Sequence, residues 1–210
     1  MNNNFEKLSE EKKKKIIDAC INEFSKNGYI NASTNNIVLN AGISKGTLFN
    51  YFENKRNLYL YILDYAIDFY VNLMLERMKD NNPDILNRIL DWAKLRLSIA
   101  AEEPIAYQFF ASAFVNIHDE IKADIMVRYN KLYSQGYKLI VENINYTLFR
   151  EDIDKQKAVE LIIASLTGIA EKYISLYKSM EDNGYEHIAK AFGQLNEYVS
   201  ILRKVYYKES

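Results

Sequence analysis

The sequence is poor in residues that break regular secondary structure and in residues that cross-link a chain. Its 210 residues include 7 glycines and 2 prolines, which leaves little room for the many tight turns of a β-sandwich or β-barrel. The single cysteine, Cys20, excludes an intramolecular disulfide and favours a reducing compartment. Long helices are therefore expected.

Signals for export or membrane insertion are also missing from the sequence. The N-terminal residues show no basic stretch followed by an apolar run, which would mark a secretory signal. The most apolar internal run, residues 161–170, is far shorter than the roughly 20 residues needed to cross a bilayer. We therefore expect a soluble, cytoplasmic protein with no membrane segment.

Apolar residues, in contrast, are abundant. Hydrophobic residues make up 49% and aromatic residues 13% of the chain, which is ample for a packed core. The net charge of −1 is unevenly spread, because residues 1–58 hold 9 Lys and Arg against 6 Asp and Glu, whereas the rest holds 18 against 22. A basic N-terminal part on an acidic body fits phosphate binding at one end, although the difference is modest.

The N-terminal third reads as three helices. Ser9, followed by two glutamates, predicts the start of a first helix that ends at Gly28. Thr34 can cap a second, short helix that Gly42 closes, and Ser44 can cap a third. Each helix carries apolar residues at helical spacing.

The remaining two-thirds also follow a helical pattern, and no β-strand alternation persists anywhere. A long fourth helix follows a polar break, and Pro83 and Pro104 sit where proline starts a helix. The sequence therefore predicts an all-α fold of about nine helices. Beyond the fourth helix, these cover about residues 84–102, 105–115, 116–146, 154–180 and 185–207.

The second and third helices, joined by residues 42–44, have the dimensions of a helix-turn-helix. The third helix breaks local rules, because Lys45 opposes the helix dipole and Gly46 costs about 1 kcal/mol relative to alanine. Leu48 and Phe52 face inward on a helix too short to be stable alone. Residues that lower the stability of a helix without an evident structural benefit indicate a functional role.

DNA binding explains these breaches. Lysine neutralises phosphate, and a glycine lets the backbone approach the duplex closely. Thr47, Asn50 and the neighbouring aromatic rings can touch base edges, thymine methyls and phosphate oxygens. The amides at the starts of the second and third helices suit phosphate oxygens.

Four segments resemble the N-terminal domain of the TetR (tetracycline-repressor) family of transcriptional regulators: FSKNGY (24–29), TNNIV (34–38), AGISKGTLFNYF (41–52) and NKRNL (54–58). The resemblance covers about residues 9–65. It implies a DNA-binding domain over 1–56 and a ligand-binding and dimerisation domain over 57–210. It assigns DNA contacts to Thr34, Ser44, Lys45, Gly46, Thr47, Phe49, Asn50, Tyr51 and Lys55.

The sequence departs from the family pattern at Phe49, where the family often has tyrosine. A hydroxyl–phosphate bond is therefore unavailable there. Phe49 could press on a thymine methyl or a sugar while Tyr51 supplies the phosphate contact. Alternatively, Phe49 packs on the fourth helix.

The resemblance further implies a homodimeric repressor that binds a palindromic operator in double-stranded DNA and is released by a small molecule. The last two helices carry wide apolar faces with small residues that permit close approach. These faces either form the dimer interface or bury against their own chain. The candidate interface residues are Leu161, Ala164, Ser165, Gly168, Ile169, Ile188, Ala191, Leu195, Tyr198 and Leu202.

A ligand pocket is expected among the middle helices, below the fourth. Its aromatic walls suit a flat, largely apolar molecule, and Glu102, Glu103 and Glu171 could pair with a cationic one. Each aromatic residue could equally serve ordinary core packing. The candidate wall residues are Trp92, Tyr107, Phe110, Phe114, Tyr129, Tyr133, Tyr173 and Tyr177.

No pattern predicts catalysis, a cofactor or a metal. The sequence has no Gly-rich phosphate loop, nucleophile elbow or paired His/acid constellation, so we expect no enzyme. His118 and His187 lie far apart without further ligands at metal-binding spacing. Two alternatives stay open: a DNA-binding protein whose C-terminal domain engages a protein partner, and an activator instead of a repressor.

Overall fold

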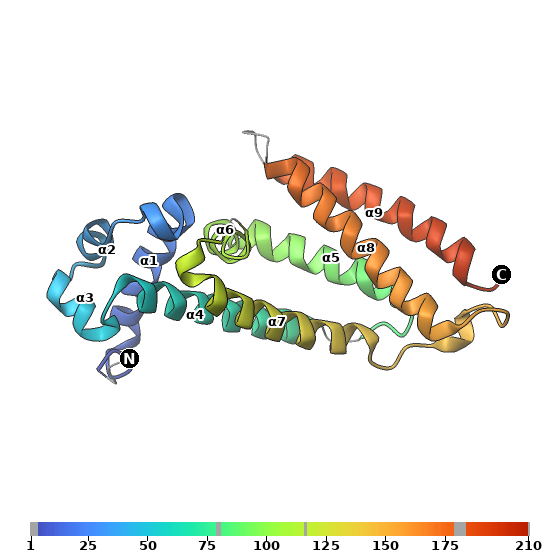
Figure 1. The fold of residues 1–210 in the computed structure, drawn as a ribbon, viewed down its shortest axis with the longest axis horizontal. Helices are drawn as coiled ribbons and strands as arrows, with labels where there is room; N and C mark the ends of the chain where they lie inside the picture. The colour runs from blue at the N-terminus through green and yellow to red at the C-terminus, as the bar shows by residue number, and fades with distance from the viewer. Residues whose placement is uncertain (1–3, 79–80, 116, 179–183, 210) are drawn as a thin grey trace. The chain divides into compact units, whose positions relative to one another are not determined.

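A computed structural model describes residues 4–78, 81–115, 117–178 and 184–209, and its description of side chains also leaves out 170, 171 and 173–192. This part of the chain contains nine α-helices and one short 3-10 helix (Figure 1). The chain divides into two compact units. Unit 1 comprises Met1–Glu76 and Glu102–Tyr133, and unit 2 comprises Arg77–Ala101 and Ser134–Ser210.

The prediction of an all-α fold is confirmed. Unit 1 is built from α1 (Glu10–Asn31), α2 (Thr34–Ala41), α3 (Lys45–Phe52), most of α4 (Lys55–Arg77), α6 (Pro104–Ser112) and the first part of α7 (Asp119–Val141). Unit 2 contains nearly all of α5 (Ile85–Glu102), the end of α7, the 3-10 helix η1 (Tyr146–Leu148), α8 (Lys155–Lys178) and α9 (Gly184–Tyr206). The predicted division into a DNA-binding domain over 1–56 and a ligand-binding and dimerisation domain over 57–210 concerns function, and it stays a prediction.

Three local expectations need correction. The cap of α2 is Ser33, whose side chain accepts from the Asn36 amide, and Thr34 is the first helical residue. Gly28, with φ 63° and ψ −174°, kinks α1 without ending it, so the chain adds another turn as far as Asn31. Pro83 lies outside α5, whose first amides are capped by the Asp84 carboxylate.

Unit 1 has one continuous apolar core. The predicted stripe of α1 is buried against α4, with Ile16, Cys20 and Phe24 at most 2% exposed. The Phe24 ring lies 6.1 Å from Phe109 of α6 and 4.9 Å from Tyr59 of α4, centroid to centroid, so α6 is packed directly onto the first helix. Burial raises the pKa of the Cys20 thiol to about 12, so it stays protonated and packs as a small apolar group.

Among the described residues, α4 is the helix long and apolar enough to cross a membrane, judged by length and composition only. No uninterrupted apolar run marks this helix in the sequence, because its apolar residues are interspersed with Asp64 and Asp68. Leu58, Ile62 and Leu63 of α4 are fully buried in the core of unit 1, which accounts for its apolar composition.

Unit 2 has its own core, in which the start of α5 packs with α8, α9 and the end of the chain. Figure 1 shows α8 and α9 running side by side. Asp84 links the start of α5 to α9 and to the end of the chain. Its carboxylate accepts from Arg203 Nη1 of α9 and from Tyr207 Oη, both at 2.7 Å, and it also caps α5. Burial favours a higher pKa for Asp84, but these hydrogen bonds outweigh it and hold the pKa below its ordinary value of 3.8.

The stability of unit 2 should fall in acid because of Asp84. A carboxyl whose pKa is lowered by folding contributes stability above its unfolded pKa and loses it as the pH falls through the folded value, here below about 3.8. We expect Asp84→Asn to cost about 2 kcal/mol at pH 7 and to flatten the loss of stability below pH 4. Urea unfolding between pH 7 and pH 3 measures both, with the exposed Glu160→Gln as control. An unchanged acid profile in Asp84→Asn would contradict the assignment.

Candidate nucleic-acid interface

The eight-residue helix α3 is held at both ends and along one side. The Ser44 hydroxyl accepts from the Thr47 amide at 3.0 Å, as predicted for an N-cap. Leu48 and Phe52 are at most 1% exposed and anchor the helix in the core of unit 1. The Phe5 ring, itself fully buried, lies 4.9 Å from the ring of Phe52. The opposite side of α3 remains open to solvent.

The turns on either side of α3 are sharp. Gly42 adopts the left-handed conformation (φ 67°, ψ 34°), which ends α2 and costs a glycine little. The Ile43 amide then bonds to the Val38 carbonyl at 3.1 Å. After α3, Glu53 has φ 65° and ψ −51°, a strained conformation for a residue with a side chain, and its amide bonds to the Phe49 carbonyl at 2.8 Å. These turns fix the angle at which α3 projects from α2 and α4.

Glu23 of α1 orients the start of α2, a role that the sequence reasoning missed. Its side chain is buried and its Oε1 accepts from the Ser33 amide and from Asn27 Nδ2, both at 2.8 Å. Its Oε2 accepts from Asn36 Nδ2 at 3.3 Å. The available signal was an acidic residue on the apolar stripe of α1, three positions after Cys20.

Most predicted DNA-contact residues lie together on the accessible side of this motif. Ser44, Lys45, Gly46 and Asn50 are exposed, whereas Thr34, Thr47, Phe49, Tyr51 and Lys55 are half-buried. Lys55 has a partner within the chain, since its Nζ donates to the Ile30 carbonyl at 2.7 Å and lies 5.4 Å from the Tyr29 ring centre. Burial lowers the pKa of Lys55.

Phe49 and Tyr51 differ in their surroundings. Tyr51 packs against the core of unit 1, with its ring 5.6 Å from that of Phe5. Phe49 is half-buried but does not belong to the residues packed on that core. Contact with DNA and packing on α4 both stay predictions for Phe49.

A Cβ on Gly46 would meet nothing closer than Ser44 Oγ, at 3.8 Å, which is an ordinary contact. The space around α3 within this chain therefore does not require glycine at position 46. Lys45 is exposed, and no salt bridge within the described residues neutralises it. Both features leave the start of α3 open to a large anionic partner.

The aromatic residues predicted to line a pocket separate into two groups. In unit 1, five of them belong to a row of ring contacts spaced 4.9–6.4 Å apart that also includes Tyr70. These five are Tyr107, Phe110, Phe114, Tyr129 and Tyr133, and we call them, with Tyr70, the aromatic row. Trp92 lies in unit 2, and the side chains of Tyr173, Tyr177 and Glu171 lie outside the described residues.

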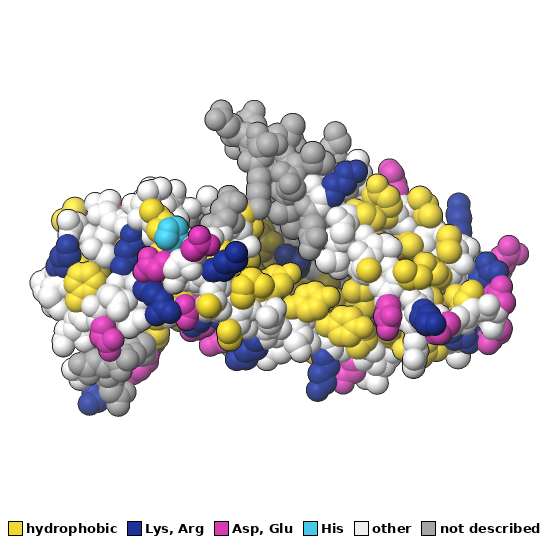
Figure 2. All heavy atoms as spheres, viewed as in Figure 1, with side chains coloured by type: hydrophobic (Ala, Val, Ile, Leu, Met, Phe, Trp, Pro, Cys, Tyr) yellow, Lys and Arg dark blue, Asp and Glu magenta, His cyan; other side chains and the backbone are white. Residues whose placement is uncertain are grey.

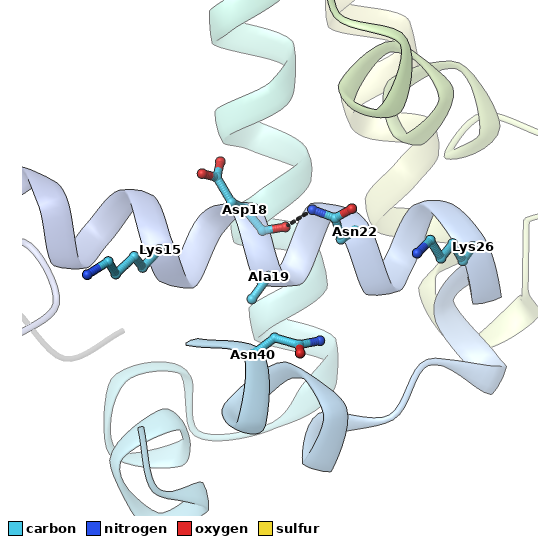
Figure 3. A pocket seen from close by; sticks show the side chains of 6 residues that line it. All are labelled: Lys15, Asp18, Ala19, Asn22, Lys26 and Asn40. Atoms are coloured by element: carbon cyan, nitrogen blue, oxygen red, sulfur yellow. Dashed lines mark hydrogen bonds between the residues drawn. The ribbon is translucent and has the colours of Figure 1, made fainter. Parts of the chain in front are cut away.

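A hollow of about 340 Å³ lies between α1 and α2 of unit 1. Figure 3 shows Ala19 and Asn40 pointing toward one another from the two helices, with Lys15 and Lys26 at the sides. Its charged and polar walls are exposed, and Asn22 Nδ2 is already bonded to the Asp18 carbonyl at 2.9 Å. This hollow is an open polar groove rather than a site for an apolar ligand.

The predicted dimer residues also divide. Leu161, Ala164, Ser165 and Gly168 are exposed on α8, and Leu161 is 54% exposed. Figure 2 shows hydrophobic side chains gathered over α8. Four others, Ile169, Leu195, Tyr198 and Leu202, are half-buried against the core of unit 2, and the side chains of Ile188 and Ala191 lie outside the described residues. Ile201 and Val205 of α9, which were not predicted, are 57% and 48% exposed.

The geometry of unit 1 defines the class of protein: a helix-turn-helix domain with an exposed, capped third helix, joined to a larger helical part. Residues 16–62 match the family model described as "Bacterial regulatory proteins, tetR family". The chain is 28% identical over 118 residues to the HTH-type transcriptional regulator RutR of Escherichia coli K12, a match that covers 54% of this chain and 55% of RutR. The match thus spans about half the length of this curated relative.

Solved structures share the fold of the whole chain. A TetR-family transcriptional regulator from Chloroflexus aurantiacus is 19% identical, with a TM-score of 0.60 and 99% of each chain covered. A transcriptional regulator from Saccharomonospora viridis, solved in complex with choline, is 15% identical, with a TM-score of 0.70, covering 96% of this chain and 100% of that one. The resemblance to the TetR family seen in the sequence is confirmed for the N-terminal part of the chain, and the fold of the whole chain is that of TetR-family structures.

We expect Glu23→Ala to destabilise unit 1 by about 2–3 kcal/mol. The change leaves the part-buried Ser33 amide and the side-chain amides of Asn27 and Asn36 without their acceptor, and such groups are costly when unsatisfied. Urea unfolding followed by circular dichroism measures the loss. Lys26→Ala, an exposed change on the same helix, is the control, and an equally small loss in both variants would show that Glu23 does not hold α2.

Proposed function

We propose that this protein is a homodimeric transcriptional repressor whose α3 enters the major groove of a palindromic operator. One observation carries the proposal: α3 is anchored on one side by Leu48 and Phe52, while Lys45, Gly46 and Asn50 stay exposed on the other. A protein has no internal use for such a surface, whereas duplex DNA offers phosphates and base edges that complement it. A regulator acting in this way works in the cytoplasm.

The start of α3 is suited to a phosphate. The first turn of a helix presents unpaired amides with a partial positive charge, and the Lys45 ammonium adds a full charge beside them. Thr47, Asn50 and Phe49 follow along the helix and supply hydroxyl, amide and apolar contacts to base edges. The start of α2, held by Glu23 and capped by Ser33, offers a second set of amides.

An operator can be found without knowing the regulated genes. Repeated selection of duplexes from a random pool should enrich a palindrome whose half-site centres lie about one helical turn, ~34 Å, or somewhat more apart. Enrichment of no common sequence would contradict the proposal. The position of the selected site relative to a promoter then separates repression from activation.

We expect Gly46→Ala to change folding and DNA binding in opposite directions. Alanine stabilises a helix interior by about 1 kcal/mol relative to glycine, and the added Cβ has room within the chain. The same methyl keeps the backbone away from the duplex, so operator affinity should fall at least about tenfold. Thermal unfolding measures the change in stability, and fluorescence anisotropy measures the change in operator affinity.

Lys45→Ala is the comparison variant. It should weaken binding to all DNA sequences and reduce the slope of log affinity against log salt concentration by about one unit. An operator affinity unchanged in Gly46→Ala would refute the close approach.

Dimerisation through α8 and α9 is proposed from their exposed apolar side chains. Leu161, Ile201 and Val205 are each about half exposed, and the small Ala164 and Gly168 would let a second copy approach closely. A dimer brings two α3 helices to one palindrome, so operator affinity depends on it.

Leu161→Glu should convert the dimer to a monomer without unfolding it. The new carboxylate would be buried unpaired in the interface, whereas Leu161 is more than half exposed in the single chain. Sedimentation equilibrium measures the state of association, and operator affinity should fall in parallel. Thr167→Glu, which places the same charge on another exposed face of α8, is the matched control. A dimer unaffected by Leu161→Glu would rule out this part of α8 as the interface.

Release from DNA is proposed to start at α6 and α7, because these helices are bonded to the DNA-binding part within unit 1. Tyr29 Oη donates to Glu120 at 2.7 Å, and Arg56 pairs with Asp124 at 2.6 Å. A ligand that binds better to a conformer with α6 and α7 displaced would move α1 and α4, and only this difference in affinity can shift the equilibrium.

The aromatic row is the candidate contact surface for a largely apolar or aromatic ligand. Aromatic faces also attract quaternary ammonium groups, and the Saccharomonospora viridis regulator of similar fold was solved with choline. A second candidate function rests on the same row. Its rings contact one another closely, and Tyr129 and Tyr133 are 38% and 52% exposed, which favours a protein partner in place of a small ligand.

A further inference from the structure

A half-open cavity of about 290 Å³ lies within unit 2, at the beginning of α5. Arg88, Trp92 and Leu95 line it from positions i, i+4 and i+7 of α5, so they share one face of the helix. Met78 and Asn81, from the segment before α5, line it as well. The cavity is separate from the aromatic row, which belongs to unit 1.

Arg88 is a buried cation that has no acidic partner among the described residues. It is 1% exposed, and its guanidinium donates to backbone carbonyls: Nε to Asn82 at 2.6 Å, and Nη1 to Ile140 at 2.7 Å and to Glu142. These last carbonyls end α7, where the helix dipole is negative and partly compensates the charge. In the described part of the chain, no carboxylate pairs with Arg88 and no atom accepts from its Nη2.

Three buried polar atoms of this cavity's residues lack hydrogen-bond partners among the described residues. They are the donors Arg88 Nη2 and Trp92 Nε1 and the acceptor Asn81 Oδ1. Native proteins leave few such atoms unsatisfied, so three on residues of one cavity require either water or a bound partner that supplies the complementary groups. That partner must accept from two donors, one of them charged, and donate to one acceptor.

We propose that this cavity binds a small organic carboxylate that also carries a hydroxyl or amide N–H. The carboxylate oxygens accept from Arg88 and Trp92, the negative charge neutralises the guanidinium, and the ligand's own donor bonds to Asn81. Met78, Leu95 and the indole ring contact its carbon atoms. The volume is at the lower end for ligand sites, which limits the molecule to the size of a short hydroxy acid or acylated amino acid.

This site goes beyond the proposed function, and binding there does not require DNA. Its consequence for unit 2 follows from Arg88, which bonds both the ligand and the last carbonyls of α7. A bound carboxylate holds the guanidinium in place and so stabilises the junction of α5 and α7.

The chain itself contains a probe of the cavity, because Trp92 is its one tryptophan. Full-length protein is titrated with lactate, 3-hydroxybutyrate and N-acetylglycine to about 10 mM, while the tryptophan emission is recorded. Lactamide, which has the shape of lactate without its charge, and inorganic phosphate are the comparison probes. We expect a saturable change with at least one acid and none with lactamide. If no acid gives saturation, the cavity holds only water and the proposal is wrong. Equal binding of lactamide, or binding of phosphate alone, would overturn the carboxylate assignment.

Variants test the donor set without removing Arg88, whose loss could unfold unit 2. Trp92→Phe keeps an aromatic ring but removes the N–H, and calorimetry should show about tenfold weaker binding of the best acid. Asp91→Asn neutralises an acid in the cavity wall and should strengthen binding about threefold. Arg96→Gln, an exposed change on the same helix, is the control and should have less effect. Weaker binding in Asp91→Asn would contradict an anionic ligand. Acid binding that persists in Gly46→Ala would separate this site from DNA recognition.

Discussion

The helix-turn-helix of this protein depends on a single constraint: an eight-residue helix cannot be stable in isolation. Helix α3 therefore exists only because Leu48 and Phe52 are buried in the core of unit 1 and Ser44 caps its first turn. Phe5 completes the packing from a segment that precedes the first helix. Since this anchoring uses one side of the helix, the other side is free to carry residues chosen for a partner.

The same core explains how a displacement of α6 or α7 could be transmitted to α3. Helix α6 packs on α1 through Phe109, and α7 is bonded to the ends of α1 and α4 through Glu120 and Asp124. Unit 1 thus joins the three N-terminal helices to most of α4, to α6 and to the first part of α7 in one compact body. In a packed core, displacement of one helix forces its neighbours to move, which is the physical basis of the proposed release.

The distinguishing feature of unit 2 is that it buries polar and charged groups. Asp84 is fully provided with donors, so its charge is compatible with burial and joins α5 to the end of the chain. Arg88, in the first turns of α5, donates only to backbone carbonyls among the described residues, and its Nη2 has no acceptor there. The contrast between a satisfied and an unsatisfied charge on one helix makes the cavity beside Arg88 the more informative feature.

The sequence by itself determined the helices, the Ser44 cap, the Gly42 turn and the exposed residues of α3, because all of these follow from spacings within one or two helical turns. Only the tertiary structure revealed the roles of Glu23, Phe5 and Arg88, and the division of the predicted pocket residues between two units. Partners on other segments lie as far as 54 positions away for Arg88, and Phe5 contacts the ring of Tyr61. Local pattern encodes the propensity of a segment, whereas which polar group finds a partner, and which does not, depends on how distant segments pack.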